Sequence, residues 1–144
     1  MKKVYILFLS VLLGAASYAD DIFTQDISAL PQTTRAMISK YFPDVGLRGI
    51  KIDKEWTSIK EYKVMLADGT ALEFAANGVF KAAENVAGLA QSLIPPAVSA
   101  YVSENYAGNK IVGIEAKPYG LEVSLSNSTD LKFDKQNKFI GVDD

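Results

Sequence analysis

The side chains of this chain that could do chemistry are carboxylates and a few loop aromatics. The 144 residues contain no Cys and no His. This excludes catalytic thiols, zinc-thiolate and imidazole metal sites, and the Ser-His-Asp triad. Paired carboxylates can cleave a glycoside, but nothing in the spacing brings two acidic residues into one pocket. Because no nucleophile–base set is recognisable, the sequence predicts that the protein is not an enzyme.

Three aspartates, Asp68, Asp130 and Asp134, lie beside expected turns. Aspartate side chains accept hydrogen bonds from nearby backbone amides in turns, and this explains their positions. A calcium site needs six or more oxygen ligands, usually gathered in one loop. Since the sequence has no Asp-x-Asp-x-Asp-Gly segment, we expect no bound metal and no cofactor.

Two aromatic residues lie in expected loops, Trp56 within residues 53–59 and Tyr119 within residues 117–120. Trp and Tyr dominate the energetic centres of protein interfaces, and loops often carry function. Alternatively, each ring folds back and covers the edge of the core. If both rings lie at one end of a paired sheet, they could grip a partner protein together.

The composition is that of an ordinary globular protein. Hydrophobic residues make up 49% of the chain, and 15 Lys and Arg stand against 17 Asp and Glu, for a net charge of −2. This composition argues against a disordered chain. The chain is also not basic enough to bind along the phosphates of a nucleic acid. Its length suits one domain or two small ones that share a core.

The N-terminal segment, 1–19, has the three parts of a secretory signal peptide. Lys2 and Lys3 precede an apolar run over residues 4–16, and small residues, Ser17 and Ala19, flank Tyr18. The run is shorter than the roughly 20 residues that a membrane span needs, and no Cys follows it for lipid attachment. We therefore expect cleavage after Ala19 and a periplasmic or secreted protein that is not embedded in the membrane.

The remainder of the chain is one motif written twice. Pro31 aligns with Pro95, and Gly49-Ile50 aligns with Gly113-Ile114 at the same offset along the chain. The loop that follows is shorter in the second copy, and beyond it Val64 aligns with Val123 at a second offset that is again constant. Matches at two constant offsets indicate a tandem duplication.

Each copy is predicted to hold one helix followed by four antiparallel strands, which is an α+β fold. Apolar residues at helical spacing begin each copy, and alternating residues with turns such as Asp68-Gly69 and Asn77-Gly78 follow. We expect an N-terminal linker at residues 20–28, repeats at 29–84 and 93–144, and a connection at 85–92. The two repeats are expected to form one compact unit by sharing a core.

The alternation also predicts one polar sheet face. Lys63 and Glu73 in the first copy, and Glu122 and Lys132 in the second, alternate with apolar residues. Antiparallel sheets can leave such a face to solvent. We therefore expect the helices on one side of the sheet and an open, polar face on the other.

Three segments carry a resemblance to a known family. They are LPQTTRAMISKYFPD (30–44), YKVMLADGTALEFAANGVF (62–80) and LEVSLSNSTDLKFDKQNKFIGV (121–142). This pattern resembles the PepSY-like proteins, which are exported bacterial proteins common in Bacteroides, with tandem units similar in fold to the β-lactamase inhibitor protein. The second copy departs from the pattern at Ser128 and Asn137, which replace turn glycines, and at Tyr106-Ala107. The resemblance implies a binding or inhibitory module rather than an enzyme.

Two functional hypotheses follow. The first is a non-enzymatic module that binds an exported or envelope protein, and could inhibit it, through the polar face and through Trp56 and Tyr119. The second is the binding of a small ligand or a peptide in a groove between the repeats. A structural role in the envelope is a third. The sequence does not specify the partner, the oligomeric state or the orientation of the repeats.

Overall fold

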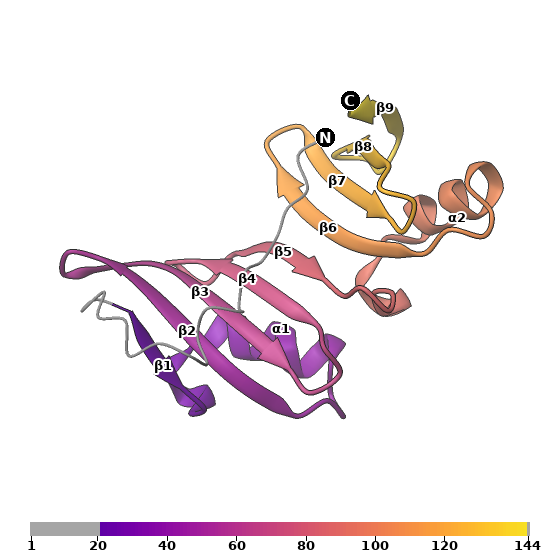
Figure 1. Cartoon of the computed structure of the whole chain (residues 1–144). Helices are drawn as coiled ribbons and strands as arrows, with labels where there is room; N and C mark the ends of the chain where they lie inside the picture. The colour runs from indigo at the N-terminus through magenta and orange to yellow at the C-terminus, as the bar shows by residue number, and fades with distance from the viewer. Residues whose placement is uncertain (1–20, 144) are drawn as a thin grey trace. The chain divides into compact units, whose positions relative to one another are not determined.

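The computed structural model of the protein describes residues 21–143 (Figure 1). The expected signal peptide, with its cleavage after Ala19, lies outside these residues. Within them, no helix is both long and apolar enough to span a bilayer.

The described chain combines two α-helices with nine antiparallel strands, so the predicted mixed α+β class is confirmed. The strands lie side by side in chain order, each hydrogen-bonded to the next. The elements of the first copy are β1 (Ile22–Thr24), η2 (Ile27–Ala29), α1 (Gln32–Tyr41), β2 (Leu47–Glu55), β3 (Ser58–Leu66), β4 (Ala71–Ala75) and β5 (Phe80–Glu84). Those of the second are η3 (Gln91–Leu93), α2 (Pro96–Asn105), β6 (Ile111–Lys117), β7 (Gly120–Leu125), β8 (Asp130–Asp134) and β9 (Phe139–Asp143).

Two features differ from the sequence-based expectations. The segment expected as a linker, 20–28, contains β1, a strand of 3 residues that pairs with β2 and is too short to show an alternating pattern. The prediction of a loop over residues 53–59 was wrong. Lys54 pairs with Ile59 and Glu55 pairs with Ser58, so the β2–β3 hairpin continues to a two-residue turn at Trp56-Thr57. This end of the hairpin is largely exposed, so its strands carry no apolar alternation.

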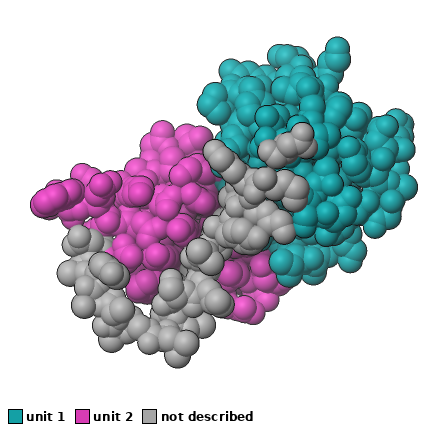
Figure 2. Space-filling model, turned by 45° about the horizontal axis from the view of Figure 1, so that its top comes forward, with its two compact units in different colours: residues 1–5, 82–144 teal, residues 6–81 magenta. Residues whose placement is uncertain are grey.

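The chain divides into two compact units with the break inside β5 (Figure 2). Residues 21–81 form the N-terminal unit and residues 82–143 form the C-terminal unit.

In the N-terminal unit, the core lies between α1 and one side of the strands (Figure 1). Thr34 and Ile38 are the buried residues of α1. The Thr34 hydroxyl donates a hydrogen bond to the Gly78 carbonyl oxygen at 3.0 Å, which ties the helix to the β4–β5 turn. The strand residues of this core are Ile50, Ile52, Tyr62, Val64, Leu66, Leu72 and Phe74.

In the C-terminal unit, aromatic rings join α2 to the last two strands. Tyr101 stacks on Phe139 with the ring centres 4.5 Å apart and meets Phe133 edge to face at 5.6 Å. Such aromatic pairs add stability beyond the burial of their surface. Because Phe133 and Lys132 are neighbours in β8, their side chains point to opposite sides of the sheet.

The two repeats make equivalent turns with different residues. Gly69 and Gly78 have positive φ angles of 90° and 87°, and in the second copy Ser128 and Asn137 take φ angles of 69° and 63°. Asn tolerates the left-handed region, whereas Ser does so at a cost. The turns predicted at Asn127-Ser128 and Gln136-Asn137 are thereby present despite the missing glycines.

Gly78 is expected to tolerate alanine much less well than Gly69. A Cβ at Gly69 would meet nothing within 4 Å, whereas at Gly78 it would lie 2.5 Å from the Thr33 hydroxyl and 2.9 Å from the Pro31 Cβ. Gly69→Ala should cost about 1–2 kcal/mol from backbone strain alone. Gly78→Ala should cost more because the helix must also move. Equal losses in urea unfolding would contradict this account of the turn.

Candidate functional site

Cross-strand register gathers charged side chains on one side of the N-terminal unit. Lys51 pairs with Lys63 across β2 and β3, and Lys63 pairs with Glu73 across β3 and β4. Their chain neighbours Ile50, Val64 and Leu72 are buried. Directly opposed residues point to the same side of a sheet, so these charges lie on the side opposite the core. We call this surface the N-terminal face, and it comprises Asp21, Lys51, Asp53, Glu61, Lys63, Glu73 and Lys81.

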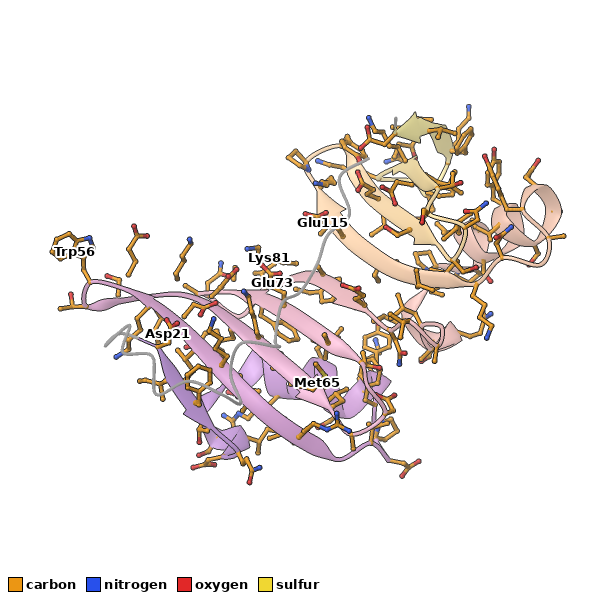
Figure 3. All side chains as sticks on the ribbon, in the orientation of Figure 1. Asp21, Trp56, Met65, Glu73, Lys81 and Glu115 are labelled. Atoms are coloured by element: carbon orange, nitrogen blue, oxygen red, sulfur yellow. The ribbon has the colours of Figure 1, made fainter. Side chains whose placement is uncertain are left out.

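Each lysine of the N-terminal face lies between two carboxylates. Lys81 is 3.1 Å from Glu61 and 3.0 Å from Glu73 (Figure 3). The other pairs are Lys51 with Asp21 at 3.6 Å and Asp53 at 3.0 Å, and Lys63 with Asp53 and Glu61, both at 3.4 Å. The carboxylate side chains are only 13–26% exposed. Such a connected network keeps its geometry better than isolated surface pairs do.

Two carboxyl groups of this network share a hydrogen bond. Burial alone would raise the pKa of Glu61, but its hydrogen bonds with Glu73 and Lys81 and the nearby charges of Lys63 and Lys81 lower that pKa to about 2. Burial and the hydrogen bond with Glu61 raise the pKa of Glu73. Within this pair, Glu61 is therefore the more acidic group and Glu73 the less acidic one.

The equivalent surface of the C-terminal unit has a different arrangement. Glu115 pairs with Glu122 and Glu122 pairs with Lys132 across neighbouring strands. We call this surface the C-terminal face, and it comprises Glu115, Lys117, Tyr119, Glu122, Lys132 and Asp143. Its ion pairs are Lys117–Glu115 at 3.2 Å and Lys132–Asp143 at 3.3 Å. Glu122 is only 3% exposed, and burial together with a hydrogen bond to Asp143 raises its pKa against the pull of Lys117.

Charge is inverted between the two faces at equivalent positions. The alignment of the two copies makes Lys51 equivalent to Glu115 and Lys63 equivalent to Glu122. By the same alignment, Asp53 corresponds to Lys117 and Glu73 to Lys132. One backbone plan thus presents two different charge patterns.

The two loop aromatics are not equivalent. Trp56 is 86% exposed at the end of the long β2–β3 hairpin, away from the sheet (Figure 3). The Tyr119 hydroxyl donates to Glu122 at 3.3 Å, and Lys132 lies 5.9 Å from the ring centre. Burial and the nearby Glu122 carboxylate raise the pKa of Tyr119 to about 12. Tyr119 is thus folded against its sheet.

The structure therefore sorts the predicted site residues into three places. Lys63 and Glu73 share the N-terminal face, Tyr119, Glu122 and Lys132 share the C-terminal face, and Trp56 stands on the hairpin end. Sequence reasoning missed the partners of these charges, namely Asp21, Asp53, Glu61, Lys81 and Asp143. The signal available was the repeated spacing of two between charges, as in Glu61-x-Lys63, which places both on one side of a strand.

Within residues 21–143, no group of three or more His, Cys, Asp and Glu side chains is placed to hold a metal ion.

The comparisons with known proteins agree with this architecture. A sequence model described as "Putative beta-lactamase-inhibitor-like, PepSY-like" matches residues 23–81 and again 60–141. No match was found among curated proteins.

Solved structures resemble the chain along most of its length. A "putative periplasmic protein of unknown function" from Bacteroides vulgatus is 35% identical, with a TM-score of 0.74 over 86% of this chain and 99% of that one. A "putative calcium-regulated periplasmic protein" from Bacteroides thetaiotaomicron is 28% identical, with a TM-score of 0.76 over 89% of this chain and 100% of that one. A second Bacteroides vulgatus periplasmic protein, from the DUF2874 family, is 30% identical, with a TM-score of 0.72 over 89% and 100% of the two chains.

Glu61→Gln is expected to change how stability depends on acid. Because the pKa of Glu61 is lowered from 4.5 to about 2, its ionised form stabilises the fold above pH 4.5, and this contribution is lost as the pH falls toward 2. Glu73 acts in the opposite direction: because its pKa is raised in the folded protein, its contribution to stability falls as the pH rises. The variant should lose about 1–2 kcal/mol at pH 7, between the values for surface and buried pairs, and should show a flatter decline in acid.

Urea unfolding between pH 2 and pH 7 measures both effects. Glu55→Gln is the matched control, because Glu55 is exposed on the same hairpin. An acid decline in Glu61→Gln as steep as that of the wild type would contradict the assignment of the ionised group.

Proposed function

This chain belongs to the PepSY-like family, and we propose that it is a non-enzymatic, periplasmic module that binds another protein through its charged sheet faces and Trp56. The observation that most directly supports this proposal is the β2–β3 hairpin. It holds part of an ordered charge network, and Trp56 at the end of the hairpin is 86% exposed. A tryptophan side chain that is this exposed is a natural anchor for a partner's pocket. The module therefore offers one apolar anchor beside an ordered charge pattern.

The network supports specificity for one partner. The lysines are held between carboxylates, so the charge pattern exists before binding and its side chains lose little freedom on docking. Complementary charges on the partner would set its orientation, and mismatched charges would exclude other proteins. The family description, beta-lactamase-inhibitor-like, makes inhibition of an exported enzyme one form that such binding could take.

The helices lie away from these faces in our proposal, which leaves each face open to a partner. In both units the buried residues of the helix share the core with the apolar strand residues, whereas the charged residues alternate with them. Small-ligand or peptide binding in a groove between the repeats is the alternative, and it stays a prediction.

Trp56→Ala is expected to abolish partner capture without unfolding the protein. The ring contributes almost nothing to the core, so the free energy of unfolding should change by less than about 0.5 kcal/mol. Binding to a purified partner identified by capture from its own periplasm should weaken more than about tenfold, as for other interface tryptophans.

Ile140→Ala is the matched control, because Ile140 is a large apolar residue that is 51% exposed on β9. It should retain capture. Equal capture by wild type and Trp56→Ala would remove Trp56 from the interface, and loss in both variants would show that any exposed apolar residue matters.

The periplasmic location leads to a prediction about processing. Protein recovered from the periplasm should have the mass of residues 20–144, because Ser17 and Ala19 suit signal peptidase. Ala19→Tyr puts a bulky side chain before the expected cut and should leave the leader attached. Intact-mass measurement distinguishes these forms, and a full-length mass for the wild type would contradict cleavage.

A further inference from the structure

The C-terminal unit has a pocket that extends beyond its charged face and includes Glu115 of that face. It has a volume of about 240 Å³, and its lining includes Glu84, Val86, Gly113, Glu115, Ser124 and Asp130. We call it the acidic pocket. Pockets for drug-sized ligands are larger than this, so the acidic pocket suits one side chain or a small linear molecule.

Strand register builds the acidic pocket. Glu84 pairs with Gly113, Gly113 with Ser124, and Ser124 with Asp130, so these four residues form one row across β5 to β8. Opposed residues point to the same side. Gly113 has no side chain, and a Cβ built there would come no closer than 3.4 Å to Ser124. The row is therefore hollow at Gly113, with carboxylates at both ends.

Two buried oxygens of residues that line this pocket lack hydrogen-bond partners. Asp130 is 1% exposed, and its Oδ2 atom has none. The Oε2 atom of Glu115 also has none, and within residues 21–143 these are the two such buried side-chain atoms. An unsatisfied buried carboxylate oxygen costs free energy unless a donor reaches it. Both residues line the same pocket, so a cation in it would lie beside two carboxyl groups that each have an unsatisfied oxygen.

The two lysines of the C-terminal face are each paired with a carboxylate other than Asp130. Lys117 contacts Glu115 at 3.2 Å through the other carboxylate oxygen, and Lys132 contacts Asp143 at 3.3 Å. Glu122 shares a hydrogen bond with Asp143. Neither of these two lysine contacts involves Asp130.

The first repeat provides an internal comparison. At the equivalent row, Gly49 pairs with Met65 and Met65 pairs with Ala71 (Figure 3 labels Met65). In the alignment of the two copies, Met65 corresponds to Ser124 and Ala71 to Asp130. A long apolar side chain thus replaces a short hydroxyl, and a methyl group replaces the buried carboxylate. Ser124 and Asp130 therefore have no polar counterparts at the equivalent positions of the first repeat.

We propose that the acidic pocket binds an alkylammonium or alkylguanidinium group. Asp130 and Glu115 would accept hydrogen bonds from the cationic end, and Val86 and Val112 at the pocket would contact its methylene chain. This chemistry has two sources, a lysine or arginine side chain of the partner protein or a free aliphatic amine. If the cation is a side chain of the partner, this proposal rests on the proposed function. If the cation is a free amine, the proposal is independent of that function.

Amide NMR titration of the processed, periplasm-purified protein tests the site with three probes. Cadaverine and agmatine carry the two cationic groups, and 1-pentanol is the uncharged control. We expect saturable shifts at Gly113, Ser124 and Asp130 with both amines and none with the alcohol. Absence of shifts with both amines, or equal shifts with the alcohol, would overturn the proposal. So would shifts with calcium chloride in place of the amines, since they would assign the pocket to a metal.

Two variants copy the first repeat and should therefore fold. Asp130→Ala removes the buried carboxylate and Ser124→Met fills the hollow, and each should weaken amine binding about tenfold or more. Glu104→Ala, at an exposed position on α2, should bind as the wild type does. If Asp130→Ala proves unstable, Ser124→Met alone decides, and amine binding unchanged in a folded Ser124→Met protein would contradict the site.

Partner capture distinguishes the sources. Loss of capture in Ser124→Met, with amine binding seen in the wild type, assigns the pocket to a side chain of the partner. Full capture in the same variant assigns it to a free amine. Failure of amine binding with Trp56-dependent capture intact would overturn this proposal and leave the proposed function standing. Amine binding without any partner capture would support the acidic pocket and contradict the proposed function.

Discussion

Cross-strand register is the constraint on which both candidate surfaces depend. Because side chains alternate along a strand, packing Ile50, Val64 and Leu72 into the core sends Lys51, Lys63 and Glu73 to the other side. Register then sets which charges face one another. Lys51 and Lys63 are directly opposed, a repulsive pair that is stable here because Asp53 lies within 3.4 Å of both. The packing on the opposite side of the sheet thus places these charges side by side, and the acidic neighbours offset their repulsion.

The two copies place charges of opposite sign at equivalent positions on this side of the sheet. In the N-terminal unit, each lysine lies between two carboxylates. Of the hydrogen-bonded pair Glu61 and Glu73, Glu73 has the raised pKa and Glu61 the lowered one. In the C-terminal unit, Glu122 takes the position of Lys63 and is buried with Asp143 as its hydrogen-bond partner. The same backbone therefore carries two faces with different charge patterns, so the two units are suited to different ligand chemistry.

Local patterns predicted most of the fold, and the interactions across strands account for what they missed. The duplication, the helix-then-strands order and the turns at Gly69 and Gly78 follow from short segments of sequence. The end of the β2–β3 hairpin was missed because its strands are exposed on both sides and carry no apolar alternation. Trp56 and Tyr119 occupy matching loops, yet only Tyr119 bonds to its sheet, because its hairpin is shorter and Glu122 lies close to it in the chain. The acidic pocket depends on a row of residues from four strands, which no single segment encodes.

The two units would contribute different kinds of binding energy to one complex. Charges on the N-terminal face are already paired, so a partner gains little by pairing with them again and must keep their geometry intact. Trp56, in contrast, gains the burial of a large aromatic surface. In the C-terminal unit, Asp130 begins with an unsatisfied oxygen, and a cation entering the pocket restores a lost hydrogen bond as well as supplying charge. Where the cation is a side chain of the partner, affinity should therefore come mainly from Trp56 and the acidic pocket, while the paired face of the N-terminal unit governs which partners are rejected.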